Sequence, residues 1–234
     1  MKGISVTQSH AGIHVYVETG SKRVFASALD WPGWCRSGRD ETAALEALVA
    51  YGPRYARAIR VVDMAPVLPA ATTGLLIDER LAGSSTTDFG APAAVPTADL
   101  LPVDDGTLDR LTALLRACWL AFDRAATAAE GKPLRKGPRG GGRDLPRMIG
   151  HVAGSTKSYL AGLGWKAELD PGAAPLAQVG HMVDEATRAL AAAAAGELPT
   201  QGSRGGKRWT LRTFVRRTAW HLLDHAWEIE DRLD

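Results

Sequence analysis

Apolar residues recur at alternating intervals of three and four from residue 104 almost to the end of the chain. The apolar residues of the first stretch are Leu108, Leu111, Leu115, Cys118 and Phe122. This spacing keeps them on one face of an α-helix. Asp104 suits the helix start, where a carboxylate faces the positive end of the helix dipole. The pattern therefore predicts a long amphipathic helix that must bury its apolar face against other elements.

Three further stretches repeat the pattern, each bounded by residues that start or stop helices. The second follows Asp144, a good N-cap, and ends near Gly164. The third ends at Gly196, and the fourth runs from about residue 210 to 233. Four helices of about 20 residues with such seams pack naturally as a four-helix bundle. Residues 104–234 are therefore predicted to form an all-α four-helix bundle.

The N-terminal part of the sequence has the pattern of a small α+β unit. Residues 13–18 alternate at period two, and residues 24–29 read as a second strand of a hairpin. Asp40 is a good N-cap for a following helix, which Pro53 should end or kink. Residues 1–60 are therefore expected to form an α+β unit.

A segment rich in Pro, Ala and Thr separates the two patterned regions. Residues 61–103 are predicted to be a connector in which Gly74–Leu81 could form one strand. The expected fold class is thus an α+β N-terminal unit followed by an all-α bundle.

Composition limits the partners and the compartment. The net charge of +2 creates no strong field for nucleic acid or a membrane surface, so neither is an expected partner. No run of about 18 apolar residues indicates a membrane span. Cys35 and Cys118 are too few and too far apart for a metal motif. We interpret them as reduced thiols and expect a cytoplasmic protein.

The last helix carries a stripe that changes from apolar to ionisable along its length. The stripe is Leu211, Phe214, Thr218, His221, His225 and Glu228. Histidines at positions i and i+4 can direct their ring nitrogens at one metal ion. A pair of partly exposed histidines that bond to neighbours is the alternative for an isolated pair. His151 in the second helix adds a third imidazole, and three imidazoles with an open position are a recurrent catalytic ligand set.

The depths of these histidines in their helices suggest the chain direction of the bundle. His151 lies roughly 10 Å from the start of its helix, and the His221/His225 pair lies roughly 15 Å from the end of the fourth. These depths match if the second and fourth helices are antiparallel, which makes the second and third helices parallel. The segment 164–173 between them can span about 33 Å. An up-down-down-up bundle is therefore expected.

Two segments resemble the ligand helices of the DinB/YfiT-like metal-binding four-helix-bundle family. They are Met148-Ile149-Gly150-His151-Val152-Ala153-Gly154 and Trp220-His221-Leu222-Leu223-Asp224-His225-Ala226-Trp227-Glu228-Ile229. The resemblance covers about residues 104–234 and implies that His151, His221 and His225 are metal ligands, with water completing the shell. It also implies an up-down-down-up bundle. Family members include thiol-dependent transferases and a mycothiol-dependent isomerase, so the family does not fix one reaction.

A metal on three neutral imidazoles keeps its full positive charge. Zn, Ni and Fe all suit this donor set, and availability decides among them. The ion would acidify bound water or bind a low-molecular-weight thiol as thiolate. Glu228, one turn beyond His225, is the candidate catalytic residue, as general base or as the carboxylate that orients an imidazole. Asp224 could orient an imidazole or pair with Arg217.

A basic loop precedes the helix that carries His151. Its cations are Lys132, Arg135, Lys136, Arg139 and Arg143. Arg135, Lys136 and Arg139 are candidates to bind an anionic substrate, a thiol cofactor or a nucleic-acid phosphate. The alternative is a solvated loop without a ligand.

The N-terminal hairpin, the Trp31-Pro32-Gly33 turn and the helix after Asp40 resemble the small HicB-like antitoxin fold. This unit could dimerise the chain or cover the site.

Two functions remain open. One is a divalent-metal-dependent enzyme on a small molecule, a thiol-dependent transferase, isomerase or hydrolase. The other is a non-catalytic, metal-stabilised binding protein whose N-terminal unit contacts a partner.

Overall fold

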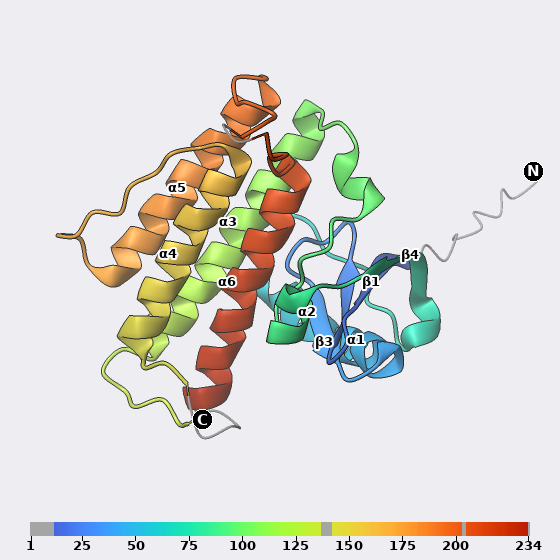
Figure 1. Cartoon of the computed structure of the whole chain (residues 1–234). Coiled ribbons are helices and arrows are strands. Elements are labelled where there is room, and N and C mark those ends of the chain that lie inside the picture. Colours follow the sequence, from blue (N-terminus) through green and yellow to red (C-terminus); the bar gives the residue numbers. More distant parts are fainter. Residues whose placement is uncertain (1–11, 137–141, 203–204, 234) are drawn as a thin grey trace, which may run out of the picture.

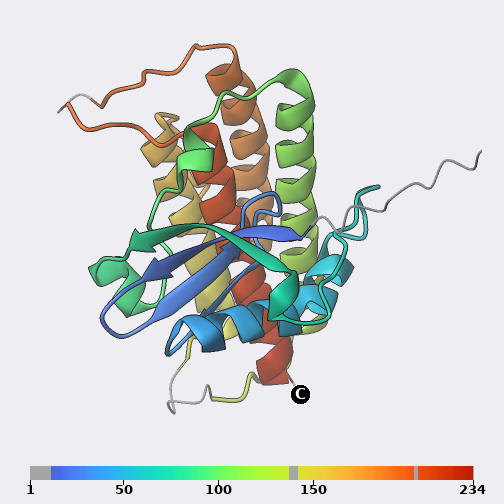
Figure 2. The ribbon, with the colours of Figure 1, turned by 90° about the vertical axis from the view of Figure 1, so that its right-hand side faces the viewer.

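A four-stranded sheet in the N-terminal region is followed by long helices (Figure 1), which agrees with the predicted order of an α+β unit before helices. The computed structural model describes residues 12–136, 142–202 and 205–233. Figures 1 and 2 show the sheet and the first helix on one side of the long helices. None of the described helices combines the length and the apolarity needed to cross a lipid bilayer.

The sheet has the strand order β3-β2-β1-β4. Its strands are β1 (Ile13–Thr19), β2 (Val24–Ala28), β3 (Cys35–Gly38) and β4 (Leu75–Ala82). The predicted hairpin is confirmed, because β1 and β2 pair antiparallel in the register Val17 to Ala26. The strand expected in the connector is also present, and it pairs with β1 in parallel. One of the two edge strands of the sheet thus comes from the segment that we predicted to be a connector.

Helix α1 (Glu41–Ala58) continues through Pro53, where the sequence led us to expect an end or a kink. Pro53 is exposed, so its ring lies on the solvent side of the helix. The turn after it is held by Tyr55, which is buried and stacks on Trp34 with ring centroids 5.4 Å apart. Tertiary packing of this aromatic pair therefore outweighs the local cost of the proline.

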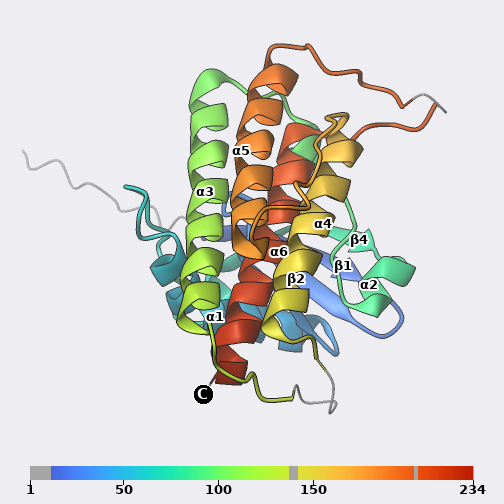
Figure 3. The same cartoon turned by 90° about the vertical axis from the view of Figure 1, so that its left-hand side faces the viewer.

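The four long helices match the predicted ones closely. They are α3 (Asp105–Ala128), α4 (Leu145–Leu163), α5 (Pro175–Ala194) and α6 (Leu211–Leu233). Asp104 and Asp144 are N-caps that accept hydrogen bonds from backbone N–H groups of the first turn at 2.8 and 2.9 Å. Gly164 ends α4 with a φ of 103°, a conformation that glycine adopts without strain. Helix α3 packs against α5 and α6, and α4 against the same two helices (Figure 3).

The sheet and the long helices share one apolar core. Buried residues of β1, β2 and α1 belong to the same cluster as buried residues of α3 and α6. Two short helices that the sequence did not reveal, α2 (Ser85–Phe89) and the 3-10 helix η2 (Thr97–Leu100), lie between β4 and α3 in the chain. Asp99 of η2 is buried and forms an ion pair with Arg216 of α6 at 2.6 Å. The middle segment is therefore tied directly to the last helix.

Candidate metal centre

Helices α4 and α6 bring three histidines together, although His151 and His221 are far apart in the sequence. His151 lies in the second turn of α4, and His221 and His225 occupy successive turns of α6. The two helices pack against each other, so the side chains meet at their contact. His221 and His225 are 6% and 7% exposed, whereas His151 is half-buried.

The imidazoles converge through their Nε2 atoms. His221 Nε2 lies 3.1 Å from His151 Nε2 and 3.2 Å from His225 Nε2. One ring nitrogen from each of the three histidines lies within 4.8 Å of a ring nitrogen of the other two. Among the described residues, these histidines form the group of His, Cys or acidic side chains that is close enough together to hold a metal ion. Two nitrogens bound to one ion at about 2.1 Å are about 3.0 Å apart at a right angle and about 3.4 Å apart at the tetrahedral angle. The observed separations fall in that interval.

Hydrogen bonds alone do not satisfy this cluster. His225 Nδ1 lies 2.9 Å from Glu228 Oε2 and must donate, because a carboxylate only accepts, so Nε2 of the neutral ring has a free lone pair. His221 Nε2 can donate one proton to one neighbour at most. Its Nδ1 is buried and has no hydrogen-bond partner among the described residues. One divalent ion would accept the lone pairs of all three rings, so the donor set fits a metal.

Burial disfavours the charged forms of His151 and His221. It lowers the pKa of His151 to about 4, and the positive charge of Arg143 acts in the same direction. Burial, followed by the neighbouring His225 and His151, holds the pKa of His221 well below its usual range. Neutral imidazoles are the form that binds metal ions.

Glu228 contacts a candidate ligand instead of pointing freely into solvent. Its Oε2 accepts from His225 Nδ1, and its Oε1 accepts from Arg232 Nη1 at 2.8 Å. The hydrogen bond from His225, together with Arg232, keeps the pKa of Glu228 below its usual range. Of the two roles left open by the sequence, this geometry favours the carboxylate that orients an imidazole, because both oxygens are already engaged.

The basic loop is fastened to the end of α6. Arg135 Nη2 donates to the carbonyl oxygen of Asp231 at 2.7 Å. Two further hydrogen bonds join Arg135 to Arg232: Arg135 N donates to the carbonyl oxygen of Arg232, and Arg232 Nε donates to the carbonyl oxygen of Arg135. The Arg135 guanidinium thus holds the loop, and Lys136 is exposed. Arg139 lies outside the described residues. Arg143, at the end of the loop, adds positive charge near His151 and His221, and Arg217 of α6 acts on His221 in the same way.

Other polar residues near the stripe have different partners from those expected. Asp224 forms an ion pair with Arg36 of β3 at 3.2 Å, so it joins α6 to the sheet. Arg217, its expected partner, donates to the carbonyl oxygen of Pro92. His181 is exposed on α5 and stands apart from the three clustered histidines. The sequence pattern could not reveal these pairs because the partners come from the N-terminal half.

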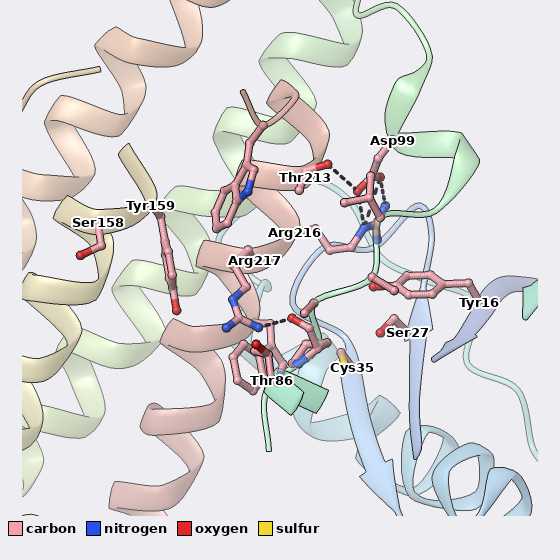
Figure 4. Close-up of a pocket in the computed structure, with 16 residues that line it drawn as sticks. Tyr16, Ser27, Cys35, Thr86, Asp99, Ser158, Tyr159, Thr213, Arg216 and Arg217 are labelled. Atoms are coloured by element: carbon pink, nitrogen blue, oxygen red, sulfur yellow. Dashed lines mark hydrogen bonds and ion pairs between the residues drawn. The ribbon is translucent and has the colours of Figure 1, made fainter. Parts of the chain in front are cut away.

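A cavity of about 460 Å³ lies near the histidines, between the sheet and helices α4 and α6 (Figure 4). Tyr159 lines it and also contacts the His221 ring edge-to-face, with centroids 5.7 Å apart. The histidines themselves are not among its lining residues. Its walls come from strands β1, β2 and β3, from helices α2, η2, α4 and α6, and from the loops between them, so no local sequence pattern could reveal it.

Comparisons of the chain with protein-family models, curated proteins and solved structures found no match in any of the three. The protein is thus defined by its own fold and site. It has an N-terminal α+β region followed by long helices, and three of its histidines lie close enough together to hold one metal ion.

Proposed function

We propose that this protein is a divalent-metal-dependent enzyme that acts on a small molecule, as a thiol-dependent transferase or isomerase or as a hydrolase. The observation that carries the proposal is the convergence of three imidazole nitrogens, one of them on the half-buried ring of His151. Three protein ligands leave a coordination position for water or substrate, which is the hallmark of catalytic sites. Because His151 is only partly buried, we expect solvent to reach that position from its side.

The proposed architecture of residues 104–234 is an up-down-down-up four-helix bundle of the DinB/YfiT-like family. The pairwise packing supports it, because α3 and α4 each pack against both α5 and α6. The placement of the candidate ligands on α4 and α6 is the arrangement that the resemblance implies.

The residues of this chain have separable tasks in the proposed reaction. His151, His221 and His225 would hold the ion, for which Zn, Ni or Fe are the candidates. A bound divalent ion would acidify water, or bind a thiol as thiolate, at neutral pH. Glu228 fixes the ring orientation and tautomer of His225. Arg143 contributes positive charge near the site, which favours an anionic nucleophile or substrate there.

A second candidate function is a non-catalytic protein whose metal stabilises the fold. The near-complete burial of His221 and His225 favours it, because structural sites are enclosed by protein. In that case the sheet, rather than the metal, would make the functional contacts.

Metal content tests the site. We expect purified His221→Ala protein to lose most of the metal that the wild-type protein contains, measured by elemental analysis after dialysis. His181→Ala is the matched control, since His181 is an exposed helical histidine away from the cluster, and it should keep the wild-type metal content. Equal metal content in both variants would refute the metal centre.

Turnover separates the two candidate functions. Wild-type protein loaded with Zn, Ni or Fe would be incubated with glutathione or cysteine and 1-chloro-2,4-dinitrobenzene, and separately with p-nitrophenyl acetate. The enzyme proposal expects turnover with at least one metal, and loss of that turnover in His221→Ala but not in His181→Ala. A metal that stays bound and sealed from exchangeable water, measured by water relaxation with Mn²⁺ in the site, would favour the non-catalytic function.

A further inference from the structure

The cavity between the sheet and the long helices adjoins the histidine cluster through Tyr159 but is not lined by the histidines, and it has the properties of a ligand site. Its volume of about 460 Å³ lies within the range of small-molecule pockets, about 300 to 1,000 Å³. Four aromatic side chains line the cavity: Tyr16 from β1, Tyr159 from α4, Trp209 just before α6 and Trp220 from α6. Figure 4 shows Tyr159 and Tyr16 on opposite sides of this space. Such walls suit a planar aromatic molecule.

One guanidinium group in the lining is available to a ligand. Arg217 lies over the Trp220 ring at 4.9 Å and over the Tyr159 ring at 5.5 Å, so two aromatic rings fix its position. Its recorded hydrogen bond is to Pro92 O, which uses one of five donors. No carboxylate pairs with it among the described residues. A stacked guanidinium with free N–H groups at its edge is suited to a planar anion.

The other charged groups of the cavity neutralise each other. Asp99 is the one carboxylate among the described lining residues, and Arg216 binds it through Nε and Nη2. Burial raises the pKa of Cys35 to about 12, so that thiol adds no negative charge at neutral pH. The cavity therefore offers the net positive charge of Arg217.

The wall of the cavity that faces the helices is preformed by hydrogen bonds within the protein. Glu18 of β1 is fully buried and accepts hydrogen bonds from Ala93 N and Ala94 N at 2.9 and 3.0 Å. These bonds hold the loop that closes the cavity. Ser27 in the lining is buried beside the Tyr16 hydroxyl and the Cys35 thiol. A cavity fixed in this way loses little entropy on binding.

We propose that this cavity binds a planar aromatic anion, whose ring lies among the tyrosine and tryptophan side chains and whose charged group pairs with Arg217. The site does not require a metal. It extends the protein's function beyond the histidine cluster, and it stands or falls independently of the proposed metal chemistry.

Fluorescence titration of the full chain tests the site with 8-anilino-1-naphthalenesulfonate as the probe. We expect one saturable site per chain. Arg217→Gln should weaken binding about tenfold or more, because it removes a charge-assisted hydrogen bond. Arg212→Gln is the matched control, since Arg212 lies on the same helix but outside the cavity lining, and it should keep the wild-type affinity.

An uncharged probe separates charge from apolar contact. N-phenyl-1-naphthylamine has the same ring system without the sulfonate, so Arg217→Gln should leave its affinity unchanged. Ser158→Trp should weaken both probes, because exposed Ser158 lines the cavity rim and a larger side chain there fills it.

The outcomes that overturn the inference are distinct from those that overturn the metal site. Binding of the sulfonate must persist in His221→Ala and in protein treated with a chelator. Binding that disappears with the metal would place the probe at the histidines and refute the cavity site. Absence of a saturable site, or equal effects of Arg217→Gln and Arg212→Gln, would refute it as well.

Discussion

The tautomer of His225 follows from its neighbours and shows how single residues prepare the site. Glu228 can only accept a hydrogen bond, so it places the His225 proton on Nδ1 and leaves Nε2 free toward His221 and His151. Arg232 holds the second oxygen of Glu228, so the carboxylate cannot rotate away. Outer carboxylates of this kind fix ligand orientation and raise ligand basicity in metal sites.

Removal of this carboxylate should weaken metal binding without removing a ligand. We expect Glu228→Ala to lower the affinity for Zn²⁺ about 10- to 100-fold, as loss of such partners typically does. Glu228→Gln keeps an acceptor oxygen, so its affinity should lie between those of the alanine variant and the wild type. Competition with a chromophoric chelator measures both affinities. Glu230→Gln is the control, because Glu230 binds Arg54 instead of a histidine, and an effect equal to that of Glu228→Ala would contradict the assignment.

At the scale of elements, the sequence predicted those parts whose structure depends on local pattern. The long helices follow from apolar spacing and from caps such as Asp104 and Asp144, because these signals act within one or two turns. The candidate ligands could be found for the same reason, since His221 and His225 share one helical face. Strand β3 could not be predicted in this way, and neither could the hydrogen bonds that Glu18 accepts from the loop after α2. Both depend on contacts between segments that are distant in the sequence.

The conformation of Gly33, in the loop before β3, lets this loop pack closely against α6. Gly33 has a φ of 95°, and a Cβ atom there would lie 2.9 Å from Leu223 Cδ1 of α6. Gly33→Ala should therefore destabilise the protein by about 1 to 3 kcal/mol, through both backbone strain and crowding against α6. Urea denaturation followed by circular dichroism measures this. Gly150→Ala is the control, because a Cβ there meets nothing within 4 Å, and an equal loss in both variants would contradict the packing argument.

At the scale of the whole molecule, one buried ion pair links three parts of the chain. Arg216 of α6 binds Asp99 of η2, and it also donates to the carbonyl oxygens of Ala28 and Leu29 beside β2. We expect Asp99→Ala to destabilise the protein by about 3 to 5 kcal/mol, because it leaves an unpaired buried guanidinium.

Replacement of both partners separates the value of the pair from the cost of leaving one charge alone. The double variant Asp99→Leu with Arg216→Met should be more stable than Asp99→Ala, because no uncompensated charge remains buried. The free energies of unfolding come from urea titration. A double variant less stable than the single one would mean that the bonds of Arg216 to Ala28 and Leu29 outweigh its pairing with Asp99.

Removal of the metal distinguishes the two candidate functions at the level of the whole fold. The apolar core that the sheet and the helices share is extensive, so the metal-free chain should stay folded. At a free metal concentration of about one hundred times Kd, binding should add about 2.7 kcal/mol of stability, which corresponds to a rise in Tm of roughly 5 to 11 °C. Differential scanning calorimetry with and without a chelator measures the change, and His221→Ala should show none. Complete unfolding on chelation would instead assign the ion a structural role, and the enzyme proposal would then lose its exchangeable site.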